Sequence, residues 1–308
     1  MTPLPAAIIR RIAEIRDDNT HGAMSLTSRA GEIFHDWAVG MPHLSHADTV
    51  AQLTTLATSL CHAQPMMAPL VHLSSKLLAA SDRCTSSAEI AQTVMTLSRQ
   101  FVEQLHARLD AVAVNAAEVI PDRGMVLTHS SSSTVLEALI QASERGKHFR
   151  VFCTESRPMR EGVALARRLN AAGIPATLLV DSAAYTVLST VQMILVGGDA
   201  VTPDGLVNKI GTYGLAIAAR DQTKSFYALC DSTKFLPASY PLPNQPEHDP
   251  REVLTTPMPG ISVMNYYFDR TPLELLSGII TEEGILSVSQ VKERLSSIQI
   301  HSQLLSRS

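Results

Sequence analysis

The hydrophobic pattern of the chain changes its period near residues 121–124, and this change limits the folds that the chain can adopt. Before that point, apolar residues recur at the three- and four-residue spacing of helices. After it, short unbroken apolar runs alternate with helical segments, which is typical of β-α-β units and a parallel sheet. The pattern therefore predicts an α/β chain in which an all-helical N-terminal domain, residues 1–120, precedes a sheet domain, residues 121–308.

Element boundaries follow from the same periods and from capping signals. The first half is predicted to form helices near residues 8–15, 26–37, 45–60, 69–80 and 86–112, without strands. The second half is predicted to form strands near residues 125–128, 149–154, 176–180, 193–196 and 226–230, with helices between them and one over 211–220. Residues 237–259 hold seven of the 17 prolines and should be irregular. A last helix is predicted over 289–298, followed by a frayed end, 301–308.

Charge is scarce in this chain of 308 residues, because only 18% of residues are charged and the net charge is -4. Typical soluble chains carry about 25% charged residues. This composition excludes a disordered chain and a polybasic nucleic-acid binder. No apolar run approaches the roughly 20 residues of a membrane-spanning helix. The first residues lack a signal-peptide pattern, and the four cysteines form no CxxC pair, so we expect a cytoplasmic protein with reduced thiols and no zinc site.

The shortage of charge is most pronounced in residues 38–81, where Asp48 and Lys76 are the formal charges. A surface with so few charges is usually covered by other protein. We expect that helices pack on this segment within the N-terminal domain. A contact between subunits is the second interpretation.

Polar residues gather after the predicted strands. Parallel strands present their carboxyl ends at one edge of a sheet, where ligands of open α/β sheets bind. Five such ends carry hydroxyls, acids and cations: Thr128 to Ser133, Thr154 to Gly162, Asp181-Ser182, Gly197-Gly198-Asp199 and Asp231 to Lys234. The run Asn208 to Thr212 is predicted to open the helix that follows the fourth of these strands.

Such an edge suits a small polyanion. Arg157 can bind a phosphate through two hydrogen bonds, and Lys209 and Lys234 can act as point charges. An acid among cations, such as Asp199, more often moves protons or holds sugar hydroxyls than binds phosphate. Each residue also has a plainer interpretation: Arg160 as a solvated helix residue, or His129 as a hydrogen-bonded loop residue. The convergence of independent loops favours a functional site.

Several nucleotide and hydrolase motifs are absent from the sequence. There is no GxGxxG after the first strand and no GxxxxGK[ST], so neither a nicotinamide cofactor nor a phosphate loop is predicted. There is no GxSxG elbow either. We expect no cofactor, no metal and no direct contact with nucleic acid or membrane.

Six motifs together resemble the superfamily of translation initiation factor 2B α/β/δ subunits. Its enzyme relatives are ribose-1,5-bisphosphate isomerase and methylthioribose-1-phosphate isomerase. The motifs are Val126-Leu-Thr-His129-Ser130, Thr154-Glu-Ser-Arg-Pro158, Val196-Gly-Gly-Asp199, Asn208-Lys-Ile-Gly-Thr212, Ser232-Thr-Lys-Phe235 and Tyr267-Phe-Asp-Arg-Thr-Pro272, with Thr281-Glu-Glu-Gly-Ile285 as a C-terminal addition. The resemblance covers nearly the whole chain. It implies that the sheet domain is Rossmann-like, binds the ligand and forms dimers or larger homo-oligomers.

The resemblance also implies roles for individual residues. The isomerases place a catalytic cysteine at the position of Ser130 and a catalytic aspartate at that of Asp199. It implies substrate-binding roles for Gly22, Ala23, His129, Ser131, Arg157, Arg160, Asn208, Lys209 and Lys234. Two arginines of the isomerases are replaced, by His21 before Gly22-Ala23 and by Gln64 before Pro65. A serine hydroxyl is a weaker acid than a thiol and needs a neighbouring base.

Three functions follow as alternatives. The first is a phosphosugar-binding protein that isomerises an aldose 1-phosphate, such as ribose-1,5-bisphosphate, to a ketose phosphate. The second is a non-catalytic regulatory subunit, similar to the initiation factor 2B α subunit, that senses a sugar phosphate or a nucleotide. The third is a structural paralogue with an empty edge.

Overall fold

The computed structural model describes residues 3–19, 21–40, 44–245 and 247–305. The described chain divides into two compact units. The helical unit comprises residues 1–107, 236–243 and 296–308, and the sheet unit comprises residues 108–235 and 244–295. The division falls inside one long helix, α5 (Ser87–Val119), so that each unit contains a part of it.

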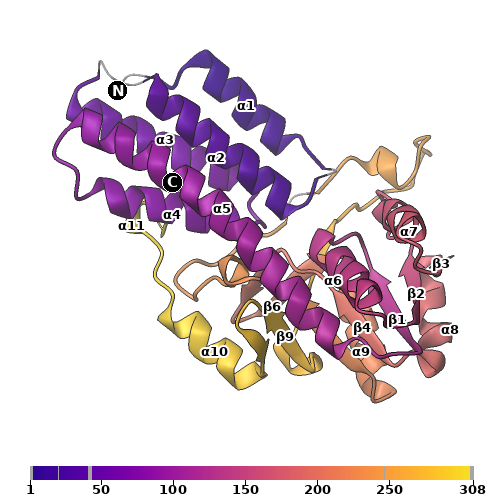
Figure 1. Cartoon of the computed structure of the whole chain (residues 1–308). Coiled ribbons are helices and arrows are strands. Elements are labelled where there is room, and N and C mark those ends of the chain that lie inside the picture. The colour runs from indigo at the N-terminus through magenta and orange to yellow at the C-terminus, as the bar shows by residue number, and fades with distance from the viewer. Residues whose placement is uncertain (1–2, 20, 41–43, 246, 306–308) are drawn as a thin grey trace. The chain divides into compact units, whose positions relative to one another are not determined.

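Five helices build most of the helical unit (Figure 1). They are α1 (Ala6–Arg16), α2 (Ala23–Val39), α3 (His46–Ala63), α4 (Ala68–Ser81) and the first part of α5. The predicted helix starts are present: the Ser45 side chain caps α3 by accepting from the Asp48 N–H, and a proline lies in the first turn of α4. No strand occurs in the described part of this unit.

The charge-poor segment lies mainly in α3 and α4. Ten of the 14 residues of α4 are buried, so this helix is covered on most of its faces. On α3, the hydroxyls of Thr54, Thr55 and Thr58 donate to carbonyls four residues earlier and need no charged partner. Packing within the helical unit therefore accounts for much of the missing charge.

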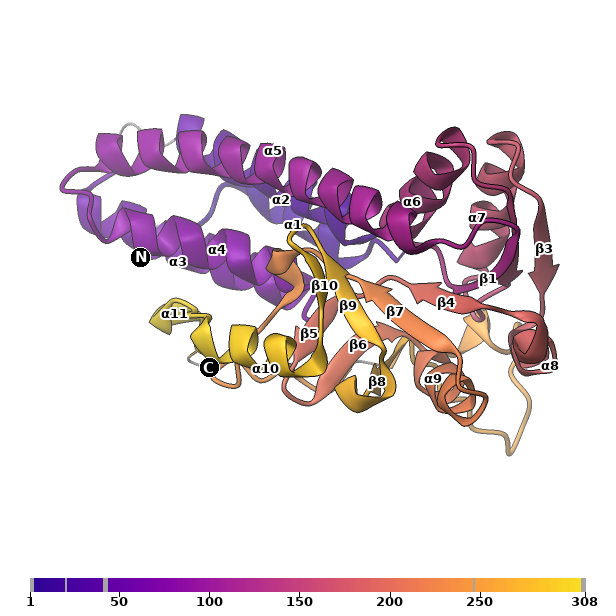
Figure 2. The same ribbon diagram turned by 60° about the horizontal axis from the view of Figure 1, so that its bottom comes forward.

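A seven-stranded sheet forms the centre of the sheet unit (Figure 2). Its order is β10-β9-β7-β4-β1-β2-β3. All neighbouring pairs are parallel except that of β9 and β10. The strands are β1 (Gly124–His129), β2 (Phe149–Thr154), β3 (Ala176–Leu179), β4 (Met193–Val196), β7 (Ser225–Leu229), β9 (Gly278–Thr281) and β10 (Gly284–Leu286). This architecture confirms the predicted fold class.

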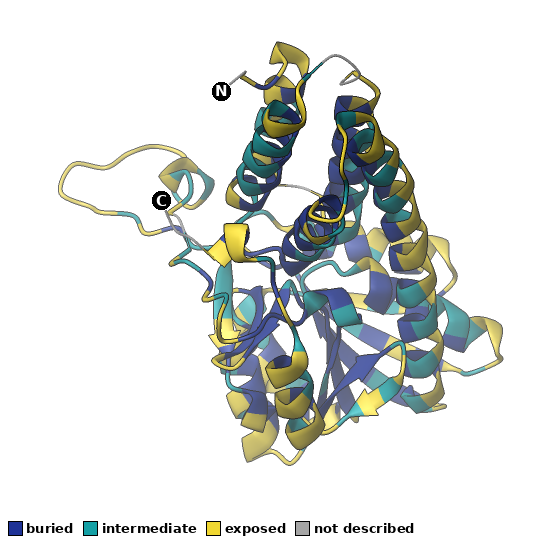
Figure 3. Cartoon of the chain, turned by 90° about the vertical axis from the view of Figure 1, so that its left-hand side faces the viewer, coloured by how far each residue is buried: buried dark blue, intermediate teal, exposed yellow. Residues whose placement is uncertain are grey.

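Helices cover both faces of the sheet. The second part of α5, α6 (Ser133–Glu144) and α7 (Glu161–Ala171) pack on one face, in a core that includes Val126, Val151 and Leu195. On the other face lie α9 (Thr212–Asp221) and α8 (Ala184–Val187). The inner strands are buried almost throughout (Figure 3), which explains their unbroken apolar sequences.

A second, antiparallel sheet was not predicted. It contains β5 (Ala200–Thr202), β6 (Gly205–Lys209) and β8 (Phe268–Thr271), with β6 in the middle. The prediction that Asn208 and Lys209 open a helix is therefore wrong, because both residues end β6 and the helix begins at Thr212. Strand pairing determines this part of the chain, since Asn208 lies opposite Asp269 and Lys209 opposite Phe268.

The C-terminal part differs from the prediction in two further respects. Strands β8, β9 and β10 lie in a stretch for which no strand was predicted. Residues 302–305, predicted to be frayed, form the short helix α11 (Ser302–Leu305) with Leu304 buried; the last three residues of the chain, 306–308, lie outside the described residues. The last predicted helix is present as α10 (Val288–Ser297). Among the described residues, no helix is long and apolar enough to span a membrane.

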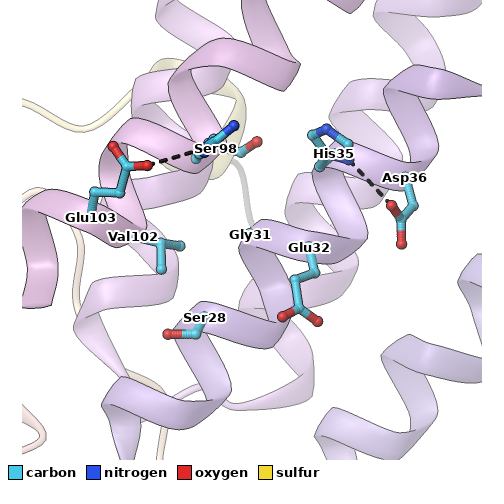
Figure 4. Close-up of a pocket in the computed structure, with 9 residues that line it drawn as sticks. Ser28, Gly31, Glu32, His35, Asp36, Ser98, Val102 and Glu103 are labelled. Atoms are coloured by element: carbon cyan, nitrogen blue, oxygen red, sulfur yellow. Dashed lines mark hydrogen bonds and ion pairs between the residues drawn. The ribbon is translucent and has the colours of Figure 1, made fainter.

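Helices α2 and α5 approach closely at Gly31. A Cβ at this position would lie 2.6 Å from Val102 Cγ2, which is too close for a real contact. Beside this contact is a pocket of about 390 Å³, lined by residues of α2 and α5 that include Ser28, Glu32 and Glu103 (Figure 4). Glycine is therefore required here by helix packing, although it is a poor helix former.

We predict that Gly31→Ala lowers the free energy of unfolding by about 1–2 kcal/mol, because the overlap with Val102 outweighs the better helix propensity of alanine. The double variant Gly31→Ala/Val102→Ala should recover most of the loss. Chemical unfolding followed by circular dichroism measures both, with Val102→Ala alone as the control. A Gly31→Ala variant as stable as the wild type would contradict the close approach.

The start of α9 is capped from another strand. Its N-cap residue, Gly211, has no side chain, and Asp269 of β8 supplies the acceptor instead: its Oδ2 accepts from the N–H groups of Gly211 (2.7 Å) and Tyr213 (3.0 Å). The other carboxylate oxygen of Asp269 is buried and has no hydrogen-bond partner among the described residues. Burial raises the pKa of Asp269 to about 6.

This raised pKa predicts a pH-dependent stability. The folded state holds the proton more tightly than the unfolded chain, whose aspartate titrates near 3.8. The stabilisation of the folded state by this proton is therefore complete below about pH 4 and is lost as the pH rises through about 6. The corresponding fall in the free energy of unfolding is roughly 1–3 kcal/mol. Relative to Asp269→Asn, the free energy of unfolding of the wild type should fall between pH 4 and pH 7. A difference that is constant or rises with pH would contradict the prediction.

Candidate functional site

The carboxyl ends of β2, β1, β4 and β7 lie side by side, so the loops that follow them are neighbours. Four predicted site residues, Ser130, Asp199, Lys209 and Lys234, meet near these ends. Ser130 and Lys209 both contact Glu161, which was not among the predicted site residues, and Lys234 contacts the carbonyl oxygen of Gly198, next to Asp199. The charges of Glu161, Lys209 and Lys234 all act on Asp199. This cluster is the candidate site.

His129 ends β1 and is buried, with both ring nitrogens in hydrogen bonds. Nδ1 lies 2.7 Å from Thr154 Oγ1 and Nε2 lies 2.8 Å from the Ile210 carbonyl oxygen. Burial lowers the pKa of His129, which favours the neutral ring. A Cβ at Gly211 would lie 3.1 Å from Nε2, so glycine allows the loop before α9 to approach the ring. His129 thus connects the end of β1 with the loop before α9, and its role in ligand binding stays a prediction.

Ser130 follows in a left-handed backbone conformation, with φ 71°. Its N–H donates to Ser156 Oγ at 2.8 Å, and this bond fixes the turn after β1. Its side chain points toward α7, where Oγ donates to Glu161 Oε1 at 3.0 Å. Ser131 comes next and is partly buried, and the Ser132 side chain caps α6 by accepting from the Val135 N–H. The serine run therefore supplies a helix cap and, at Ser130, a hydroxyl at the site.

Glu161 and Lys209 form an ion pair of 2.7 Å between Oε1 and Nζ. The exposed fraction of each side chain is small, 21% and 10% respectively. The Lys209 ammonium also lies 4.8 Å from the centre of the Tyr267 ring, a cation–π contact. Glu161 was missed because an acid in the first turn of a helix usually serves only the helix dipole. Its signal in the sequence is its place in the polar run Thr154 to Gly162 that follows β2.

Gly197 and Gly198 lie between β4 and Asp199, and a side chain on either glycine would displace a neighbouring side chain. A Cβ would lie 2.8 Å from Ser132 Cβ at Gly197 and 2.6 Å from Leu206 Cδ1 at Gly198. Burial raises the pKa of Asp199, and the charge of Glu161 adds to the rise, while Lys234 and Lys209 oppose it. Lys234, after β7, donates to the carbonyl oxygen of Gly198. The structure thus places an acid with a raised pKa within the electrostatic influence of two lysines.

The loop after β2 is held by Asp181. Its carboxylate accepts from the N–H groups of Ser156 (2.7 Å) and Arg157 (2.8 Å). The Arg157 guanidinium is exposed and donates to the Val253 carbonyl oxygen at 3.1 Å. Arg160 is exposed and pairs with Glu155 at 3.0 Å. The contacts of both guanidiniums in this state are therefore with protein, and their role toward a phosphate stays a prediction.

Asn208 is buried, and its side-chain amide donates to Thr212 Oγ1 at 3.0 Å. It thereby connects the end of β6 with the first residue of α9. This contact is structural, and a further role in binding stays a prediction.

A group of titratable residues beside Lys209 was not predicted. The His248 and Tyr267 rings stack at 3.5 Å, and Tyr267 donates through its hydroxyl to Glu252 at 2.6 Å. Burial, aided by the charge of Glu252, raises the pKa of Tyr267 and keeps the phenol protonated. Burial lowers the pKa of His248. These contacts hold His248 and Glu252, two residues of the proline-rich segment, against Tyr267.

Gly22 and Ala23 belong to the helical unit, where Gly22 is the N-cap residue of α2 and Ala23 its first residue. His21 and Gln64, at the positions where the resemblance implies arginines in the isomerases, contact the same unit. The His21 ring pairs with Asp18 at 2.8 Å, and Gln64 donates to the Ile15 carbonyl oxygen at 2.8 Å. The proposed contribution of Gly22 and Ala23 to ligand binding stays a prediction.

The described part of the chain contains no group of three or more His, Cys, Asp or Glu side chains that could hold a metal ion. What the site offers is acid–base chemistry next to positive charge. Asp199 can donate a proton, Glu161 can accept one, and two lysines can balance a negative ligand.

Comparison with known proteins identifies the family of the chain. Residues 19–288 match the initiation factor 2 subunit family. The ribose 1,5-bisphosphate isomerase of Methanocaldococcus jannaschii is 28% identical over 278 residues, 89% of each chain. The 5-deoxyribose 1-phosphate isomerase of Moorella thermoacetica is 34% identical over 65% of this chain and 62% of that protein.

Among solved structures, the Pyrococcus horikoshii translation initiation factor eIF-2B superposes with a TM-score of 0.79 at 29% identity. The match covers 92% of this chain and 98% of that one. Sequence motifs, topology and these matches lead to one conclusion: the chain belongs to the initiation factor 2 subunit family.

Proposed function

We propose that this protein is an aldose–ketose isomerase that acts on a sugar 1-phosphate. The observation that carries the proposal is Asp199, an acid with a raised pKa beside Lys209 and Lys234 at the carboxyl edge of a parallel sheet. Relatives named as ribose 1,5-bisphosphate isomerase and 5-deoxyribose 1-phosphate isomerase support this class of substrate.

The proposed reaction moves a proton between adjacent carbons after the sugar ring opens. Opening requires an acid that protonates the ring oxygen, and Asp199 in its protonated form fits this role. Asp199 then takes a proton back from the hydroxyl on the carbon that becomes the ketone, so that substrate and product carry the same number of protons. The proton that leaves carbon requires a base, for which Ser130 occupies the position of the thiol. Lys209 and Lys234 would balance the phosphate and the negative charge that develops on the opened sugar.

Asp199→Asn should lower kcat by at least about 100-fold, because an amide donates no proton to the substrate. Ribose 1,5-bisphosphate, 5-deoxyribose 1-phosphate and methylthioribose 1-phosphate are the assay panel. Asp204→Asn is the matched control, since Asp204 is an exposed aspartate whose contact is a 3.4 Å ion pair with Arg270. Unmodified protein that turns over none of the panel, or no faster than Asp199→Asn, would contradict catalysis.

The second candidate is a non-catalytic regulatory subunit that senses a sugar phosphate or a nucleotide. It is favoured by the hydroxyl of Ser130, at a position where the resemblance implies a thiol in the isomerases, because a hydroxyl is a poor acid–base group. Under this alternative, sugar phosphates or nucleotides raise the melting temperature without turnover. A panel that neither shifts the melting temperature nor reacts would contradict both candidates and leave a structural paralogue.

We further propose that the protein is a cytoplasmic homo-oligomer, a dimer or larger. Three large side chains on α8 and α9, Tyr185, Tyr213 and Ile217, are 44%, 41% and 40% exposed and offer an apolar surface for a second copy. Sedimentation should detect a dimer or larger species, and the charged double variant Tyr213→Glu/Ile217→Glu should weaken it. A monomeric wild type would contradict the proposal, and an unaffected variant would contradict this surface.

A further inference from the structure

Three side chains from different elements meet at the site. They are the hydroxyl of Ser130 after β1, the carboxylate of Glu161 on α7 and the ammonium of Lys209 on β6. Ser130 Oγ donates to Glu161 Oε1 at 3.0 Å, and Lys209 Nζ lies 2.7 Å from the same oxygen. The second oxygen, Glu161 Oε2, is buried and has no hydrogen-bond partner among the described residues. An unsatisfied buried carboxylate oxygen costs stability, so its retention at a candidate site requires an explanation.

The position of each member is fixed by separate contacts. The turn at Ser130 is held by the bond from its N–H to Ser156 Oγ, 2.8 Å long. The first turn of α7 is pressed against the end of β2, because a Cβ at Gly162 would overlap the Thr154 carbonyl oxygen. Lys209 lies on the Tyr267 ring. The contact between Ser130 and Glu161 is therefore preorganised, as a proton-transfer pair requires.

A serine hydroxyl cannot accept a proton efficiently unless its own proton leaves at the same time. We propose that Glu161 is the group that takes it. When the substrate gives up a proton to Ser130 Oγ, the original hydroxyl proton passes to Glu161 Oε1. One O–H bond of Ser130 breaks as another forms, Glu161 becomes neutral, and the substrate gains one negative charge. The reverse transfer returns a proton to the adjacent carbon.

Lys209 completes the charge balance of this step. Its ammonium pairs with the Glu161 carboxylate before the transfer. Once that carboxylate is neutral, the ammonium can interact with the negative charge of the substrate instead. Glu161 acts through Ser130 and is thus a positioning residue. This inference rests on the proposed isomerase function and adds to it the means by which a serine replaces a thiol.

The alternative is that Glu161 only holds Lys209 and α7 in place. Glu161→Gln tests this, because glutamine keeps the shape and a hydrogen-bond acceptor but takes up no proton. In the Ser130 background we expect kcat to fall at least about 100-fold. In the Ser130→Cys background the same change should cost less than about tenfold, because a thiol ionises without help.

An equal loss in both backgrounds, or no loss in the Ser130 background, would overturn the proposal. Glu137→Gln on α6, whose carboxylate accepts from Gln141 at 3.0 Å, is the matched control and should retain activity. Thermal unfolding of each variant separates failed folding from lost proton transfer.

A second measurement does not depend on turnover. Phenylmethanesulfonyl fluoride sulfonylates an activated serine: Ser130 Oγ bonds to sulfur, fluoride leaves, and the hydroxyl proton passes to Glu161. Peptide mass spectrometry should show labelling of Ser130 at least about tenfold faster in the wild type than in Glu161→Gln. Equal labelling, or none in either protein, would contradict activation by Glu161. If labelling differs but no sugar phosphate reacts, the proposed function fails while the Ser130–Glu161 pair stands.

Discussion

The ion pair between Lys209 and Glu161 is the contact on which the candidate site depends. It connects the end of β6, in the antiparallel sheet, with the start of α7, which follows β2 of the parallel sheet. An ion pair with so little exposure is stable only if other contacts compensate for the desolvation of the two charges. The Ser130 hydroxyl and the Tyr267 ring supply such contacts. The pair adds to the hydrogen bond between His129 and the Ile210 carbonyl oxygen, which also joins the ends of the two sheets.

The parallel sheet could be predicted because its strands are apolar on both faces. Val126, Val151 and Leu195 lie in one core with the covering helices, so burial leaves an unbroken hydrophobic run that is visible in the sequence. The antiparallel sheet was missed because β5 has three residues, too few for a period to appear. The turn Pro203-Asp204-Gly205 between β5 and β6 is the signal that could have identified this hairpin.

The site could be predicted only in part, for a similar reason. The ends of the buried strands can be predicted from the sequence. Because parallel strands present these ends at one edge of the sheet, Ser130, Asp199 and Lys234 are expected near one another. Lys209 reaches the same place from β6, by strand pairing that local sequence does not encode. Hydrogen-bond partners could not be predicted either. The sequence suggests a phosphate-binding role for Arg157 and a hydrogen-bonded His129, but it does not identify the Val253 and Ile210 carbonyl oxygens that these residues contact.

The proposed site moves a proton between carbons through carboxyl and hydroxyl groups that exchange with solvent. The direct measurement is the conversion of ribose 1,5-bisphosphate or 5-deoxyribose 1-phosphate in heavy water, followed by nuclear magnetic resonance. We expect a ketose phosphate that carries deuterium at the carbon receiving the proton. Conversion with no deuterium in the product, or no conversion at all, would contradict it.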